Sequence, residues 1–256
     1  MEISPGQFRK LADLVYEEAG IRLTDQKYEL LKSRLAKRLR KTGFSLTRDY
    51  IEFIGRDRDE FNRFIDAITT NHTFFFRENA HCEYIISNIP SSSFLKIWCA
   101  ACSSGEEPYS LALQLIDNNY RIGISATDLS DTMLDKARKG IFPMERVNHV
   151  PQYLLRRYFQ KGSNRYEGQV KVKKEIRELV QFSRFNLITD AMNDRFDIIF
   201  CRNVMIYFDA ATRQKTVDTL VQSLKPGGIL FTGMSESLNG ISHPLKQVMS
   251  SAYKKV

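Results

Sequence analysis

Small and acidic side chains follow two predicted strands in this 256-residue chain. The stretch 100–108 contains a single glycine, Gly105, followed by Glu106 and Glu107, and a further acid, Asp128, lies about 20 residues later, after the next predicted strand. In open α/β sheets ligands bind beyond the carboxyl ends of the strands, so these acids are candidates for ligand contact. They also have structural explanations, because acids favour the first turn of a helix and Asp128 could act as an N-cap.

The pattern favours a cationic nucleoside over a dinucleotide. A pyrophosphate loop needs several glycines, and adjacent carboxylates at Glu106 and Glu107 would repel phosphate, which disfavours an NAD-dependent dehydrogenase. Glu106 suits an ammonium or sulfonium group, and Asp128 suits ribose hydroxyls. S-adenosylmethionine carries all of these groups and no phosphate.

Alternating strand and helix patterns predict the sheet that would position these residues. Residues 151–186 interrupt the alternation and predict a small antiparallel insert, and residues 246–255 predict an antiparallel edge strand. The predicted strands are 94–99, 122–127, 196–201 and 229–232, and the helices between them are 108–117, 131–139 and 211–224.

The first 70 residues predict a separate helical domain. Ser4 and Gln7 form a capping-box pattern, Gly20 is a helix stop, and apolar residues recur at helical spacing in the segments that follow. Residues 71–80 would link this domain to the cofactor site, and residues 81–256 would form the main domain.

Composition is that of a globular protein, with 43% hydrophobic residues and a formal charge of +8. No apolar run approaches the length of a membrane span, so we expect a cytoplasmic protein. Cys99 and Cys102 form a CxxC pair, but no second pair or histidine motif completes a metal site, and we expect packing and no metal.

Several segments together resemble the CheR family of chemotaxis receptor methyltransferases. They occur in order between about residues 70 and 237. They are Asn71-His72-Thr73-Phe74-Phe75-Phe76-Arg77, Ser104-Gly105-Glu106-Glu107-Pro108-Tyr109-Ser110, Asn186-Leu187 and Phe200-Cys201-Arg202-Asn203-Val204-Met205-Ile206-Tyr207-Phe208.

This resemblance implies a class I S-adenosylmethionine-dependent methyltransferase with a Rossmann-like, mostly parallel sheet, an N-terminal helical domain and an inserted β-subdomain. It implies methylation of receptor glutamates to methyl esters, with S-adenosylhomocysteine as the other product. Arg202, Asn203 or Tyr207 would position the acceptor carboxylate, and Arg77 could pair with the methionyl carboxylate. The implied cofactor-binding residues are Asn71, Thr73, Arg77, Gly105, Glu106, Asp128, Asn186, Leu187, Arg202 and Asn203.

A cluster of cations between residues 27 and 41 favours an acidic partner. By resemblance this partner is the glutamate-bearing cytoplasmic helices of membrane-bound chemoreceptors, although a solvated helix face explains the same charges. The candidate contacts are Arg34, Lys37, Arg38 and Lys41. In some relatives the β-subdomain also binds a receptor tail, but Gly162-Ser163-Asn164 lacks the second glycine near Asn164 that such members tend to carry.

Two rival functions share the predicted fold. A nucleic-acid methyltransferase would also use a basic face, but no Asn/Asp-Pro-Pro-Tyr/Phe site follows residues 196–201. A non-catalytic adaptor that binds receptor tails would not need a full set of pocket residues. We therefore expect an enzyme that does not bind nucleic acid.

Overall fold

The structure is a computed structural model that describes residues 2–69 and 71–256. Met1 and Thr70, the ends of the predicted helical domain, lie outside the described residues. The described chain forms two compact units. The N-terminal unit holds the described residues before Asn71 together with Tyr207–Arg213, and the larger unit holds Asn71–Ile206 and Gln214–Val256.

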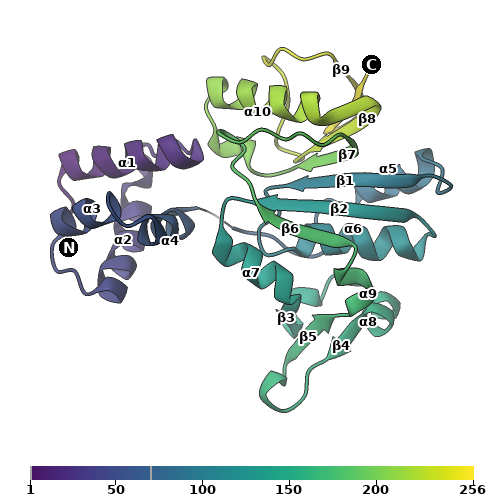
Figure 1. The fold of residues 1–256 in the computed structure, drawn as a ribbon, viewed down its shortest axis with the longest axis horizontal. Coiled ribbons are helices and arrows are strands. Elements are labelled where there is room, and N and C mark those ends of the chain that lie inside the picture. The colour runs from purple at the N-terminus through teal and green to yellow at the C-terminus, as the bar shows by residue number, and fades with distance from the viewer. Residues whose placement is uncertain (1, 70) are drawn as a thin grey trace. The chain divides into compact units, whose positions relative to one another are not determined.

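The N-terminal unit is a helical bundle, as predicted. Ser4 Oγ accepts a hydrogen bond from Gln7 N at 3.3 Å and Ser4 N donates to Gln7 Oε1 at 3.0 Å, so the capping box forms. Gly20 ends the first helix in the left-handed conformation, with φ of 65°. The helices are α1 (Pro5–Ala19), α2 (Tyr28–Thr42), α3 (Thr47–Ile54) and α4 (Arg58–Ile68) (Figure 1).

The segment Tyr207–Arg213 belongs to this unit through direct contacts with the end of α1 and the residues after it. Ile21 and Phe208 form an antiparallel bridge, and the hydroxyl of Tyr16 donates to Asp209 at 2.7 Å. Contacts between residues so distant in sequence leave no local signal, and the sequence placed this segment in the main domain.

The larger unit is built on a seven-stranded sheet in the order β6-β2-β1-β7-β8-β10-β9 (Figure 1). The first five of these strands pair in parallel, which brings their carboxyl ends to one edge, and the last two pair antiparallel. This confirms the predicted α/β class. The strands are β1 (Phe94–Ala100), β2 (Arg121–Asp128), β6 (Val180–Arg184), β7 (Phe196–Cys201), β8 (Leu224–Thr232), β9 (Leu245–Met249) and β10 (Ala252–Lys255).

The central strands are apolar along nearly their whole length because both faces of the sheet are covered. Trp98 of β1 is fully buried, and the rings of Phe200 and Phe231 stack with centroids 4.8 Å apart. α6 packs on β2, and α7 packs on β2 and β6. The helices of this part are α5 (Ala80–Asn88), α6 (Glu106–Asp117), α7 (Asp131–Lys139), α8 (Gln152–Tyr158), α9 (Lys174–Arg177) and α10 (Ala210–Ser223), of which residues 210–213 belong to the N-terminal unit.

A small antiparallel sheet is present, with boundaries that differ from the predicted insert. Its order is β3-β5-β4, formed by Ile141–Pro143, Gln169–Val172 and Phe159–Lys161 respectively. It therefore begins before residue 151. The strand near Val180, expected in the insert, instead joins the large sheet as β6, parallel to β2. An alternating pattern identifies a strand but does not identify its partner.

The C-terminal stretch forms a hairpin where the sequence predicted one edge strand. Ser251 has a left-handed φ of 59°, which ends β9 and starts β10. β10 then pairs antiparallel with both β8 and β9, so the edge of the sheet is formed by β9.

Candidate cofactor and acceptor site

The loop between β1 and α6 is held in an unusual conformation. Ala101, Ser103 and Gly105 all adopt left-handed φ values, of 65°, 50° and 95°. Non-glycine residues in this region carry strain and persist only where the surroundings enforce it. A Cβ atom at position 105 would lie 2.9 Å from Cβ of Ala137 on α7, so only glycine fits there.

Asp128 ends β2 and fixes this loop. One carboxylate oxygen accepts from Ser103 N at 2.8 Å, and the other accepts from Ser130 N at 2.9 Å. The side chain therefore joins the loops that follow β1 and β2. Both hydrogen bonds come from backbone N–H groups, and Asp128 is only 8% exposed.

Glu106 is the first residue of α6 and is only 1% exposed. Ser104 Oγ donates to its carboxylate at 2.6 Å, and Arg146 Nη1 lies 3.8 Å from its other oxygen. Burial raises the pKa of the Glu106 carboxyl, while the Ser104 hydrogen bond and the Arg146 charge act in the opposite direction. A buried acid of this kind favours a cation as its neighbour.

The segment after Thr70 runs along this loop and the start of α6. The hydroxyl of Ser103 donates to Asn71 O at 3.4 Å, and Phe76 N donates to the hydroxyl of Ser110 at 2.9 Å. Phe75 is fully buried, with its ring centroid 4.9 Å from that of Phe142. The middle phenylalanine thus anchors the segment in the core.

Arg202, after β7, is enclosed between two carboxylates. Its Nε lies 3.2 Å from Glu78, its Nη1 lies 3.2 Å from Glu107, and its Nη2 donates to the carbonyl of Arg77 at 2.5 Å. Its side chain is 4% exposed. Burial raises the pKa of Glu107, and the Arg202 charge lowers it.

Asn203 is positioned by Glu236, which the sequence analysis missed. The Glu236 carboxylate accepts from Asn203 N at 2.6 Å, Gly233 N at 2.7 Å and Ile206 N at 3.2 Å. A Cβ at Gly233 would lie 2.6 Å from Glu236 Oε2. The rule that singled out Asp128 applies here as well, because Glu236 follows the carboxyl end of β8.

Asn186 and Leu187 follow β6 and are 5% and 8% exposed. Asn186 N donates to Asp190 at 2.8 Å, and its side-chain oxygen accepts from Ile188 N at 3.0 Å. This local turn presents both residues beyond a parallel strand. Arg77 is also among the predicted cofactor residues. Its Nε lies 3.9 Å from the Glu78 carboxylate, and its Nη1 donates to His72 O at 2.9 Å.

All ten predicted cofactor residues thus lie in the larger unit, either in the segment 71–77 or at the carboxyl ends of β1, β2, β6 and β7 and in the residues that follow these strands. Tyr207 differs. It belongs to the N-terminal unit, where its carbonyl accepts from Arg22 N at 3.4 Å and Lys27 Nζ lies 5.1 Å from its ring centroid. Its role with the acceptor stays a prediction.

Arg38 is not a free surface cation, which corrects its place in the predicted docking set. Its guanidinium forms a two-pronged pair with Glu60, at 2.9 and 2.5 Å, and the Tyr50 hydroxyl donates to the same carboxylate at 2.8 Å. Helical periodicity places Arg38 near an exposed face but cannot show that a buried acid lies opposite. Arg34, Lys37 and Lys41 are exposed.

The four cysteines are buried free thiols. Burial raises the pKa of Cys99 and Cys102 well above the ordinary thiol value, so both are unreactive. Within residues 2–69 and 71–256, no group of three or more metal-ligating side chains is gathered. None of the helices in that same part of the chain is both long enough and apolar enough to cross a membrane.

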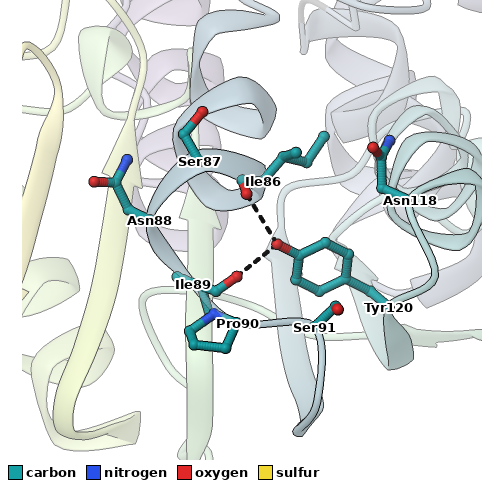
Figure 2. Close-up of a pocket in the computed structure, with 8 residues that line it drawn as sticks. All are labelled: Ile86, Ser87, Asn88, Ile89, Pro90, Ser91, Asn118 and Tyr120. Atoms are coloured by element: carbon teal, nitrogen blue, oxygen red, sulfur yellow. Dashed lines mark hydrogen bonds between the residues drawn. The ribbon is translucent and has the colours of Figure 1, made fainter.

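A pocket of about 370 Å³ lies at the amino ends of β1 and β2, away from the carboxyl edge. Tyr120 is one of its lining residues, with its hydroxyl 2.6 Å from Ile89 O and 3.2 Å from Ile86 O (Figure 2). The hydroxyl satisfies carbonyls at the end of α5, which have no partner within the helix. We therefore assign this pocket a structural role.

The residues at the carboxyl edge fit a nucleoside that carries an ammonium and no phosphate. Glu106 and Asp128 are buried acids, Gly105 allows close backbone approach, and Leu187 is an apolar wall. A mostly parallel sheet with acids at these strand ends is the architecture of S-adenosylmethionine-dependent methyltransferases.

Comparison with known families specifies the class further. The model described as "CheR methyltransferase, SAM binding domain" matches residues 71–254, and "CheR methyltransferase, all-alpha domain" matches residues 6–69. The chain belongs to the CheR methyltransferase family.

Relatives align over nearly the full chain. A chemotaxis protein methyltransferase of Borreliella burgdorferi is 34% identical, covering 100% of this chain and 96% of that protein. One from Escherichia coli is 38% identical over 93% and 87% of the two chains. Chemotaxis protein methyltransferase 2 of Pseudomonas aeruginosa is 36% identical over 96% and 91%.

Proposed function

We propose that this chain methylates glutamate side chains of chemoreceptors, using S-adenosylmethionine and releasing S-adenosylhomocysteine. The observation that carries the proposal is the full-length match to the CheR family, together with the acids gathered at the sheet edge. The reaction would take place in the cytoplasm, at membrane-bound receptors.

The proposed cofactor pocket uses the ten residues predicted from the sequence. Asp128 would accept from ribose hydroxyls, and Glu106 would bind the ammonium. Asn186 would present its amide to adenine, with Leu187 as an apolar wall. Asn71 and Thr73 would close the pocket from the segment that Phe75 anchors in the core.

Bound S-adenosylmethionine would supply a methyl group on a positively charged sulfur. The acceptor glutamate is ionised near pH 7, so it needs no general base from the protein. The work left to the chain is to hold the carboxylate in line and to exclude water from it.

Arg202 would act as a positioning residue. All three of its guanidinium nitrogens already contact Glu78, Glu107 or the Arg77 carbonyl. It therefore holds these groups in place, and Asn203 would be the residue that meets the acceptor. The amide of Asn203 lies 3.3 Å from Glu78 and would turn toward the substrate.

The receptor would dock on the exposed cations of α2. Arg34, Lys37 and Lys41 recur at helical spacing and are exposed, so they form one positive stripe. The glutamate-bearing helices of a receptor are acidic and match this charge. A second contact, which stays a prediction, is an extended receptor tail that pairs with the edge strand β4. This strand is three residues long, so it offers few backbone hydrogen bonds to a tail.

The test is transfer of tritium from labelled S-adenosylmethionine to receptor-rich membranes, followed by release of labelled methanol in base. Base-labile methanol reports an ester. Transfer to RNA or DNA, with a salt-sensitive shift, would support the nucleic-acid alternative. Receptor binding without transfer would support a non-catalytic adaptor.

A further inference from the structure

Arg146 is a cation that the sequence analysis did not consider, and it lies beside Glu106. It belongs to the short 3-10 helix Met144–Val147, between β3 and α8. Its Nη1 donates to Thr73 O at 2.7 Å and lies 3.8 Å from the Glu106 carboxylate. Arg146 thus joins the segment after Thr70 to the acid at the start of α6.

The backbone that carries Arg146 is anchored on both sides. Val147 is 2% exposed, Met144 N donates to Gly168 O at 2.9 Å, and Val150 N donates to Val147 O at 2.9 Å. The side chain itself is 41% exposed, whereas that of Glu106 is 1% exposed. The acid is enclosed, and the guanidinium retains an open side.

Both contacts of Arg146 are made through Nη1. Among residues 2–69 and 71–256, no hydrogen bond from its Nε or Nη2 is formed. The edge of the guanidinium that carries these two donors matches the geometry of a carboxylate, which it can bind through two parallel hydrogen bonds.

The amino-acid end of S-adenosylmethionine needs an acid and a cation side by side, because its ammonium and carboxylate share one carbon atom. Glu106 and Arg146 form such a pair. We propose that Arg146 binds the methionyl carboxylate while Glu106 binds the ammonium; this rests on the proposed function. Arg77 contacts Glu78 and the His72 carbonyl, and Arg146 is the one arginine among the described residues that is paired with Glu106.

The experiment compares two ligands by calorimetry on the full chain. S-adenosylmethionine carries the carboxylate, and its decarboxylated analogue keeps the amine and the nucleoside but lacks it. The unmodified chain should bind the first more tightly. Arg146→Ala should reduce that preference about tenfold, the size expected for one charge-assisted contact, and should leave the analogue's affinity unchanged.

Two further variants are matched controls. Lys136 on α7 is exposed, and its charge also acts on Glu106, so Lys136→Ala tests a general loss of positive charge and should keep the preference. Glu106→Gln should weaken both ligands together, because both carry the amine.

Two results would overturn the assignment. One is an Arg146→Ala variant that keeps the full preference while Arg77→Ala loses it. The other is an Arg146→Ala variant that weakens both ligands and 5′-methylthioadenosine equally, which would show that Arg146 only supports Thr73. Absence of any binding by the unmodified chain would instead refute the proposed function.

Discussion

At the scale of single residues, the larger unit gathers buried charges that neutralise one another. Arg202 is shared by Glu78 and Glu107, and its removal would leave two carboxylates close together in an enclosed position. Losing one partner of a buried ion pair is strongly destabilising, because the remaining charge is no longer compensated. The charges at this edge therefore act as a set.

Replacing Asp128 by Ala should weaken binding of S-adenosylhomocysteine by at least about tenfold. The change removes the proposed ribose acceptor and also the carboxylate that holds Ser103 and Ser130. Arg77→Ala should weaken binding as well. Calorimetry measures both, with thermal unfolding to check that the variants fold. Unchanged affinity in both would refute the proposed pocket.

His81 should make the stability of the larger unit depend on pH. Burial, and then the charge of Arg202, lower its pKa to about 4, and neither ring nitrogen has a hydrogen-bond partner among the described residues. The unfolded chain, with a His pKa near about 6.5, binds more protons between these values. The free energy of unfolding should therefore decrease by up to about 3 kcal/mol as pH falls from about 6.5 toward 4.

Denaturant unfolding across this pH range measures the effect. His81→Leu removes the titrating group and should flatten the curve between pH 4 and 6.5. The exposed His149 provides the control, since His149→Leu should keep the slope. Parallel curves for His81→Leu and the unmodified chain would show that His81 is not responsible.

At the scale of elements, the sequence predicted helices and strands from local patterns, but it did not predict which distant residues would pair. The capping box at Ser4 and Gln7 and the strand at Phe196–Cys201 depend on neighbouring residues, and the structure has them as predicted. The contact of Arg202 with Glu78 joins residues that are far apart in sequence. The same holds for Arg38 and Glu60, where periodicity gives a helix face but not its neighbour.

Arg38→Ala should destabilise the helical bundle by about 3–5 kcal/mol, because it leaves the Glu60 carboxylate buried and without its guanidinium. Arg34→Ala, on the same helix and exposed, is the matched control and should change stability by less than about 0.5 kcal/mol. Denaturant unfolding followed by circular dichroism measures both. Equal effects would show that the Arg38–Glu60 pair contributes little.

At the scale of the whole molecule, the formal charge of +8 is unevenly distributed along the chain. The exposed cations of α2 concentrate positive charge on one helix, while Glu106 and Asp128, at the carboxyl edge of the sheet, are buried and hydrogen-bonded. Surface charge of this kind accelerates encounter with an acidic partner and is weakened by salt. Binding of receptor and binding of cofactor should therefore respond to different substitutions.

Reversing the charge at Arg34 and Lys37 to Glu should lower the rate of receptor methylation by about tenfold or more at low salt. The affinity for S-adenosylhomocysteine should stay within about twofold, because both residues are exposed on α2. Initial rates at several salt concentrations, with calorimetry on the same samples, measure the two effects. A variant that loses both properties would point to misfolding rather than docking.

Because Gly105 lies so close to Ala137, the residue that can occupy one of these positions depends on the residue at the other. A larger residue at 137 would press on the same backbone as a side chain at 105, so the helix is restricted as strictly as the turn. Variation confined to the turn should yield few folded proteins. A library that seeks a new loop shape must vary α7 at the same time, since the space between them is shared.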